Sequence, residues 1–157
     1  MERRVLKLEN FPAVLQECQR LLDDGYRKGG QWSLGQICWH MRLTMDAHRQ
    51  GYPLWMSLFA PVRPFFRKFL LPRLLAGDSP AGLKTASIFQ PPESVEDAGE
   101  LRLLQESIVA FQKHQSPLKP HPGFGRLRRT DAETFHAAHA AHHLSFLLPA
   151  CEDRSEG

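Results

Sequence analysis

Apolar residues recur at the spacing of an α-helix in four segments of the chain, and this pattern restricts the fold more than any other feature. The segments cover about residues 12–25, 33–50, 95–114 and 130–149. In each of them apolar side chains return every three or four residues, so that one face of the helix would be buried. No stretch of alternating apolar and polar residues persists elsewhere. The sequence therefore predicts an all-α protein.

Three of the predicted helices begin at a recognisable N-terminal signal. Asn10 precedes the first apolar repeat and is a candidate N-cap. Ser33 with Gln36, and Thr130 with Glu133, have the spacing of a capping box at the starts of the second and fourth helices. These signals indicate where each helix begins independently of the apolar pattern.

One connection between the predicted helices is much longer than the others. It covers residues 52–92, with an aromatic and basic first half and a second half rich in Ser, Pro and Gly. A connection of this length inside a small domain is often functional. Four helices with one long crossover between the second and third predict a four-helix bundle. We expect one domain over residues 1–150 and a flexible tail over residues 151–157.

Composition excludes several classes of function. The formal net charge of +3 is too small to indicate a nucleic-acid-binding protein. The 3 cysteines form no C-x-x-C pair, which argues against a disulfide framework and fits a cytoplasmic protein, and no secretion signal is recognised. The most apolar region, residues 52–75, is interrupted by basic residues and prolines, so it predicts no membrane span. The prolines also weaken a membrane-surface interpretation, and no membrane partner is expected.

Histidine is the residue type whose distribution points to a function. The chain has 8 histidines. Four of them are crowded into one short stretch of the fourth predicted helix: His136, His139, His142 and His143. At about 100° per residue, these side chains share an arc of the helix with Phe135 and Phe146. The histidines of the fourth helix are therefore expected to face the core.

A second helix also directs a histidine inward. His40 lies on the same arc as Ile37 and Leu43 in the second predicted helix. A single inward histidine is usually a satisfied core residue, but each unpaired buried ring would cost about 1–3 kcal/mol. A divalent cation removes this cost, because it takes neutral imidazole nitrogens as ligands. The sequence therefore predicts a metal site formed by His40 and the i, i+4 pair His139 and His143.

Three segments resemble motifs of one protein superfamily. WSLGQICWHM at residues 32–41 resembles the second-helix motif of the DinB/YfiT-like superfamily, and HAAHH at residues 139–143 resembles its fourth-helix motif. HPGFGRL at residues 121–127 resembles an uncharacterised branch, a domain of unknown function. The resemblance implies a four-helix bundle with a three-histidine metal site. By position, its ligands are His40, His139 and His143.

The resemblance also suggests classes of activity. The superfamily includes thiol S-transferases, a maleylpyruvate isomerase and proteins described as metal-dependent hydrolases. Many members continue the double histidine with Arg-Gly-Gln, whereas Leu144, Ser145 and Phe146 follow here, which departs from the thiol-transferase pattern. We expect a cytoplasmic metal-dependent transferase or hydrolase whose substrate is a small molecule, anionic or a thiol. Zinc is the favoured metal, and nickel or iron would also accept imidazole ligands.

The residues around the predicted ligands leave several alternatives open. His142, His136 and Gln36 are candidates for a catalytic role, but each also has a structural interpretation, which for Gln36 is the capping box. Residues 55–75 either roof the site and attract an anionic substrate, or simply pack as short helices with a basic edge.

An alternative function needs no catalysis. The chain would then be a helical bundle that forms a homodimer or binds a partner through apolar helix faces. Three histidines outside the predicted metal site are expected on the surface or in loops: His48, His114 and His121. Cys38 is expected to point away from His40, because it lies about 160° from it around the helix.

Overall fold

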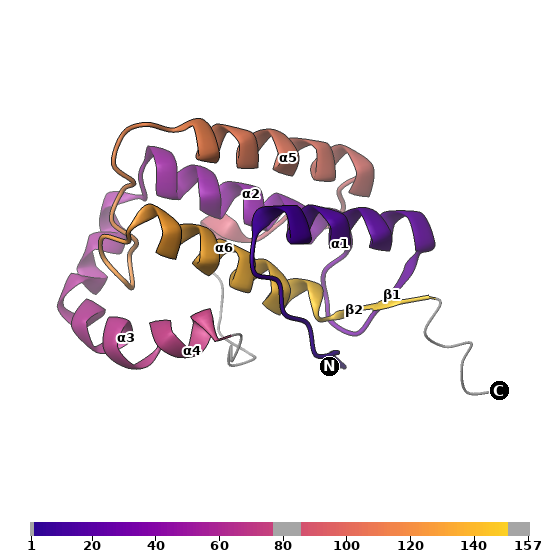
Figure 1. Cartoon of the computed structure of the whole chain (residues 1–157), viewed down its shortest axis with the longest axis horizontal. Helices are drawn as coiled ribbons and strands as arrows, with labels where there is room; N and C mark the ends of the chain where they lie inside the picture. Colours follow the sequence, from indigo (N-terminus) through magenta and orange to yellow (C-terminus); the bar gives the residue numbers. More distant parts are fainter. Residues whose placement is uncertain (1, 77–85, 151–157) are drawn as a thin grey trace.

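The computed structural model describes residues 2–76 and 86–150. Over these residues the chain is mostly helical, with six α-helices, two 3₁₀ segments and one sheet of two short strands (Figure 1). In chain order the elements are α1 (Phe11–Asp24), β1 (Tyr26–Lys28), α2 (Leu34–Gln50), η1 (Leu54–Val62), α3 (Arg63–Phe69), α4 (Leu71–Leu75), η2 (Ser87–Phe89), α5 (Asp97–Lys113), α6 (Arg129–Leu144) and β2 (Leu147–Pro149). This content fits the predicted all-α class.

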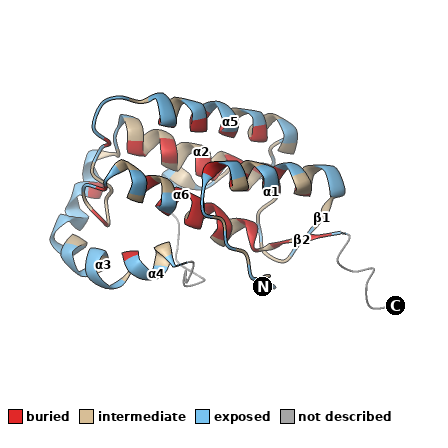
Figure 2. Cartoon of the chain, in the orientation of Figure 1, coloured by how far each residue is buried: buried red, intermediate tan, exposed pale blue. Residues whose placement is uncertain are grey.

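The four long helices lie against one another and enclose the core. α2 contacts both α5 and α6, and α1 contacts the same two helices. Phe111 and Leu21 are fully buried between them, and buried residues recur along α6 from Ala132 to Leu144 (Figure 2). α6 is the most alanine-rich of these helices, and small side chains allow its backbone to approach its neighbours closely.

Two of the predicted helix starts are confirmed. The Asn10 side chain accepts a hydrogen bond from the backbone in the first turn of α1. Ser33 Oγ accepts from the Gln36 backbone, and the Gln36 side chain accepts from the Ser33 backbone, which completes the capping box of α2. The third signal is wrong: α6 begins one residue before Thr130, so this residue lies inside the first turn of the helix.

The end of the last helix also differs from the prediction. The helical pattern was expected to continue to Pro149, but α6 ends at Leu144 and, after a turn, Leu147–Pro149 form β2. β2 runs antiparallel to β1, with Tyr26 opposite Pro149 and Lys28 opposite Leu147. Strands of three residues are too short to show an alternating pattern, so the prediction of no strand was wrong here.

The long connection between α2 and α5 contains η1, α3 and α4, which form one end of the molecule (Figure 1). No helix of the described part of the chain is long and apolar enough to span a bilayer. The predicted flexible tail, residues 151–157, lies outside the described residues.

Candidate metal centre

Three imidazole rings converge where α2 packs against α6. His40 lies near the middle of α2, and His139 and His143 lie one turn apart on α6. The Nε2 atom of His139 is 3.3 Å from that of His40 and 3.0 Å from that of His143. One nitrogen from each of the three rings lies within 4.8 Å of the others. Tetrahedral zinc, with bonds of about 2.0–2.1 Å, requires nitrogens about 3.3 Å apart, so this group could hold a metal ion.

The orientation of the His40 ring is set by a backbone contact. Its Nδ1 donates a hydrogen bond of 2.8 Å to the carbonyl oxygen of Phe89 in η2. With the proton on Nδ1, the lone pair of Nε2 points toward His139. Hydrogen bonds of this kind hold metal-binding histidines in one tautomer and one ring orientation. The connection between α2 and α5 therefore supports the site directly.

Aromatic rings enclose the three histidines. Trp32 stacks on His143 with ring centroids 5.1 Å apart and planes at 22°, and its centroid is also 5.1 Å from that of His40. Phe135 stacks on His139 at 5.8 Å and 25°. These contacts restrict the motion of the rings and limit the access of water from two sides.

Burial keeps the three rings neutral. It lowers the pKa of His40 and holds the pKa values of His139 and His143 well below 6.5, an effect to which the neighbouring imidazoles add for the last two. Because a metal ion requires a deprotonated ring nitrogen, neutral rings at pH 7 favour binding. His40 is 2% exposed, and His139 and His143 are of intermediate exposure.

The His139 ring differs from the His40 ring in the hydrogen bonding of Nδ1, the nitrogen that does not face the other histidines. Its Nδ1 is buried and has no hydrogen-bond partner within residues 2–76 and 86–150. The backbone therefore anchors the centre through the ring on α2, while aromatic packing orients the ring of His139.

The three catalytic candidates occupy different positions. His142 is partly buried beside the centre, with its ring centroid 5.1 Å from that of His143. His136 is 1% exposed and faces His48 instead, outside the three-histidine group. The Gln36 side chain takes part in the capping box, and its Nε2 donates to the Pro92 carbonyl at 2.7 Å.

The sequence interpretation missed a second pair of buried imidazoles. His48 was expected on the surface or in a loop, which is wrong, because it is fully buried in α2. Its Nδ1 lies 3.0 Å from Nε2 of His136. The available signal was the spacing of eight residues from His40, which places His48 about 80° away on the helix, on the inward side.

Two further expectations concern residues near these pairs. His121 lies in a loop, as predicted, but its ring stacks on Phe124 at 4.7 Å and is not a surface group. Cys38 is buried as a free thiol and is not part of the three-histidine group, as its position on the helix predicted.

The fold and the site together define a mostly helical protein in which three histidines could hold a metal ion. Residues 1–150 match the family described as protein of unknown function DUF1569, and the chain belongs to this family. No curated protein and no solved structure matches the sequence. The family match supports the resemblance to an uncharacterised domain, and the wider DinB/YfiT-like relationship stays a prediction.

Proposed function

We propose that this protein is a metal-dependent enzyme of the DinB/YfiT type, in which α1, α2, α5 and α6 form a four-helix bundle. His40, His139 and His143 are the proposed ligands of one divalent cation. The observation that carries the proposal is the convergence of three neutral imidazoles, at 3.0 and 3.3 Å between Nε2 atoms, from helices far apart in the sequence. Without a shared ligand, three rings brought so close would leave buried polar atoms poorly matched.

The number of protein ligands favours a catalytic site over a structural one. Structural zinc sites have four protein ligands, whereas catalytic sites have three and keep a position for water or substrate. A bound cation would supply a Lewis acid at that position. Zinc is the favoured ion, with nickel or iron as alternatives. We propose transfer or hydrolysis of a small molecule, anionic or a thiol.

The residues around the centre have distinct proposed roles. The Phe89 carbonyl and Trp32 position the rings of His40 and His143. His142 is the strongest candidate for handling a proton, because it is partly buried beside a proposed ligand. Burial lowers its pKa, so it is neutral at pH 7 and able to accept a proton.

Metal content tests the proposed ligands. The wild-type protein, purified without chelator and measured by plasma mass spectrometry, should contain about one metal ion per chain. His40→Ala and His143→Ala should both lose it, because each leaves only two imidazoles in the group. His142→Ala is the matched control, since it removes a neighbouring imidazole from the same helix and should retain the metal.

Two results would contradict the ligand assignment. One is the same metal content in His40→Ala and His143→Ala as in the wild type, with circular dichroism showing both variants folded. The other is a wild-type protein that takes up no zinc, nickel or iron on reconstitution. The enzymatic part is tested separately, by thiol-transfer and ester-hydrolysis assays on the metal-loaded protein. Turnover that persists in both ligand variants would argue against metal-dependent catalysis.

A further inference from the structure

One end of the molecule exposes an unusual set of hydrophobic side chains. Within the described residues, seven large hydrophobic side chains that are 43–89% exposed lie in η1 and α3: Leu54, Trp55, Leu58, Phe59, Val62, Phe65 and Phe69. Single exposed hydrophobics are ordinary on a protein surface, but a contiguous group marks an interaction site. We call this group the η1–α3 face.

The opposite side of the same segment is already attached to the domain. Met56 is only 6% exposed. Arg63 Nε donates a hydrogen bond of 2.8 Å to the carbonyl of Pro122, and Arg67 Nη1 donates one of 2.9 Å to the carbonyl of Phe124. η1 and α3 are thus attached to the rest of the domain through their inner side, and the η1–α3 face stays exposed.

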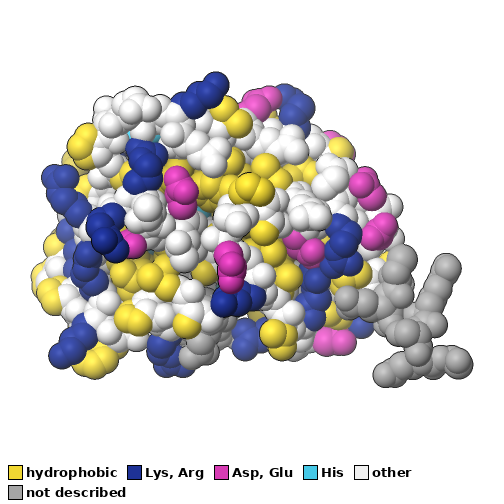
Figure 3. Space-filling model, in the orientation of Figure 1, with side chains coloured by type: hydrophobic (Ala, Val, Ile, Leu, Met, Phe, Trp, Pro, Cys, Tyr) yellow, Lys and Arg dark blue, Asp and Glu magenta, His cyan; other side chains and the backbone are white. Residues whose placement is uncertain are grey.

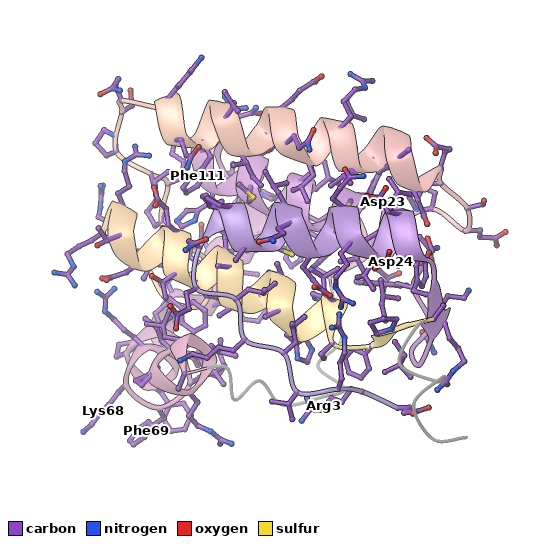
Figure 4. The ribbon with its side chains drawn as sticks, turned by 45° about the vertical axis from the view of Figure 1, so that its right-hand side comes forward. Arg3, Asp23, Asp24, Lys68, Phe69 and Phe111 are labelled. Carbon is purple, nitrogen blue, oxygen red and sulfur yellow. The ribbon has the colours of Figure 1, made fainter. Side chains whose placement is uncertain are left out.

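Among residues 2–76 and 86–150, the charges around this face are almost all positive. The sequence contains no acidic residue between Asp46 and Asp78. Lys68 is exposed beside the hydrophobic side chains, and its Nζ lies 5.4 Å from the Phe69 ring centroid. Figure 3 shows basic side chains around hydrophobic ones at this end of the molecule, and Figure 4 shows Lys68 and Phe69 projecting outward from α3.

Among the described residues, an acidic side chain lies close to the basic groups. The positive charge of Arg67 acts electrostatically on Asp131, but the Asp131 carboxylate is already paired with Arg128 at 2.9 Å. The η1–α3 face therefore presents hydrophobic groups framed by positive charge, a composition that complements an anionic surface.

We propose that the η1–α3 face binds the surface of a lipid bilayer that contains anionic headgroups. Trp, Phe and Leu with neighbouring Lys and Arg are the side chains that insert at the boundary between headgroups and acyl chains. A bilayer accepts such side chains without a shaped partner surface, and its anionic lipids attract the basic residues.

A second copy of the chain fits this face less well. A two-fold symmetric dimer places the same patch on both subunits. The Lys68 side chains of the two copies would then lie in the same interface, and residues 47–76 contain no acidic residue to compensate them. The headgroups of an anionic bilayer would instead bring negative charge to the same basic residues.

This inference revises the expectation of no membrane partner. That expectation rested on the prolines, which prevent one long amphipathic helix across residues 52–75. The structure shows that the prolines divide the segment into η1, α3 and α4, and that η1 and α3 nevertheless expose their hydrophobic side chains together. The proposal does not depend on the metal centre.

Vesicle co-sedimentation tests the inference. The full chain is mixed with vesicles of phosphatidylcholine alone, or of phosphatidylcholine with about 30% phosphatidylglycerol as the anionic lipid. We expect clear binding to the anionic vesicles and weak binding to the neutral ones. Raising the salt from about 0.1 M to about 0.5 M should weaken the binding, because it screens the basic side chains.

Two variants separate the hydrophobic and electrostatic contributions. Phe65→Ser/Phe69→Ser should weaken binding at least about tenfold, because two inserting rings are lost. Lys68→Glu should weaken it at least about fivefold, the effect of about one cation near the surface. The matched control is Val109→Ser/Lys113→Glu on α5, which changes one exposed hydrophobic and one exposed basic side chain away from the face and should bind like the wild type.

Three outcomes would overturn the proposal. They are no binding to anionic vesicles, equal binding to neutral and anionic vesicles, and equal loss in the α5 control and in Phe65→Ser/Phe69→Ser. Analytical ultracentrifugation adds a fourth. A wild-type dimer that becomes a monomer in Phe65→Ser/Phe69→Ser, without vesicle binding, would show that a second copy covers the face. Metal content should stay unchanged in all variants, which separates this inference from the proposed enzyme function.

Discussion

At the scale of single residues, this protein buries imidazole rings beyond the metal centre. His48 and His136 each contribute one nitrogen to their 3.0 Å contact, and within the described chain their other ring nitrogens have no hydrogen-bond partner. Burial lowers the pKa of His48 to about 4 and that of His121 to about 3. These rings therefore stay neutral in the folded protein at pH values where they are protonated in the unfolded chain.

The free energy of unfolding should consequently decrease as the pH is lowered below about 6.5, the ordinary pKa of histidine. Between this pH and 4, unfolding exposes His48 and lets it take up a proton, which favours the unfolded state. One such proton costs about 1.4 kcal/mol per pH unit, and His48 of the unfolded chain is half protonated at pH 6.5, so we expect His48 alone to lower the stability by about 1.6 kcal/mol between pH 6.5 and 5. Above about pH 7.5, where His48 is neutral in both states, this contribution is constant. Urea unfolding with chelator present, at several pH values, measures it.

A His48→Gln variant isolates this ring. It should reduce the slope of stability against pH by about one proton between pH 6.5 and 5, whatever it does to stability at pH 7.5. An unchanged slope would mean that His48 is not the ring that takes up a proton on unfolding.

At the scale of elements, the start of α2 is fixed by its capping box, whereas Thr130 lies inside the first turn of α6. Ser33→Ala should lower the free energy of unfolding by about 1 kcal/mol, because the Gln36 backbone N–H loses its acceptor. Thr130→Ala is the matched control. Its side chain is exposed and caps no helix, so the change should stay within about 0.5 kcal/mol. Thermal and urea unfolding measure both, and a larger loss in Thr130→Ala would contradict the assigned start of α6.

At the scale of the whole molecule, Asp97 joins three elements. Its carboxylate accepts hydrogen bonds of 2.7 Å from the Tyr26 hydroxyl of β1 and of 2.7 Å from the Gly35 backbone of α2, while Asp97 itself begins α5. Residue 35 has no room for a side chain, since a Cβ atom there would lie 2.8 Å from Asp97 Oδ1. Long-range contacts of this kind set how α2 and α5 lie together.

Asp97→Ala should therefore be costly. It removes two hydrogen bonds to a charged acceptor, and we expect a loss of about 2–3 kcal/mol in the free energy of unfolding. Asp24→Ala, an exposed acidic residue at the end of α1, should change it by no more than about 0.5 kcal/mol. Equal effects of the two substitutions in urea unfolding would show that Asp97 does not join these elements.

The sequence alone indicated the four long helices and the inward direction of the histidines proposed to bind metal. Helical periodicity and capping are local properties, so residues near one another in the chain are enough to reveal them. His40, His139 and His143 share faces with apolar side chains, and this was sufficient to place all three in the core. The DUF1569 match agrees with the motif resemblance to an uncharacterised domain.

Only the tertiary structure decided the contacts between distant segments. The pairing of Tyr26–Lys28 with Leu147–Pro149, the hydrogen bond from His40 to Phe89, and the contact of His48 with His136 all join residues far apart in sequence. Which side of residues 54–69 stays exposed also depends on the docking of η1 and α3. These features follow from how the helices pack, because a side chain finds such partners only when the whole core has formed.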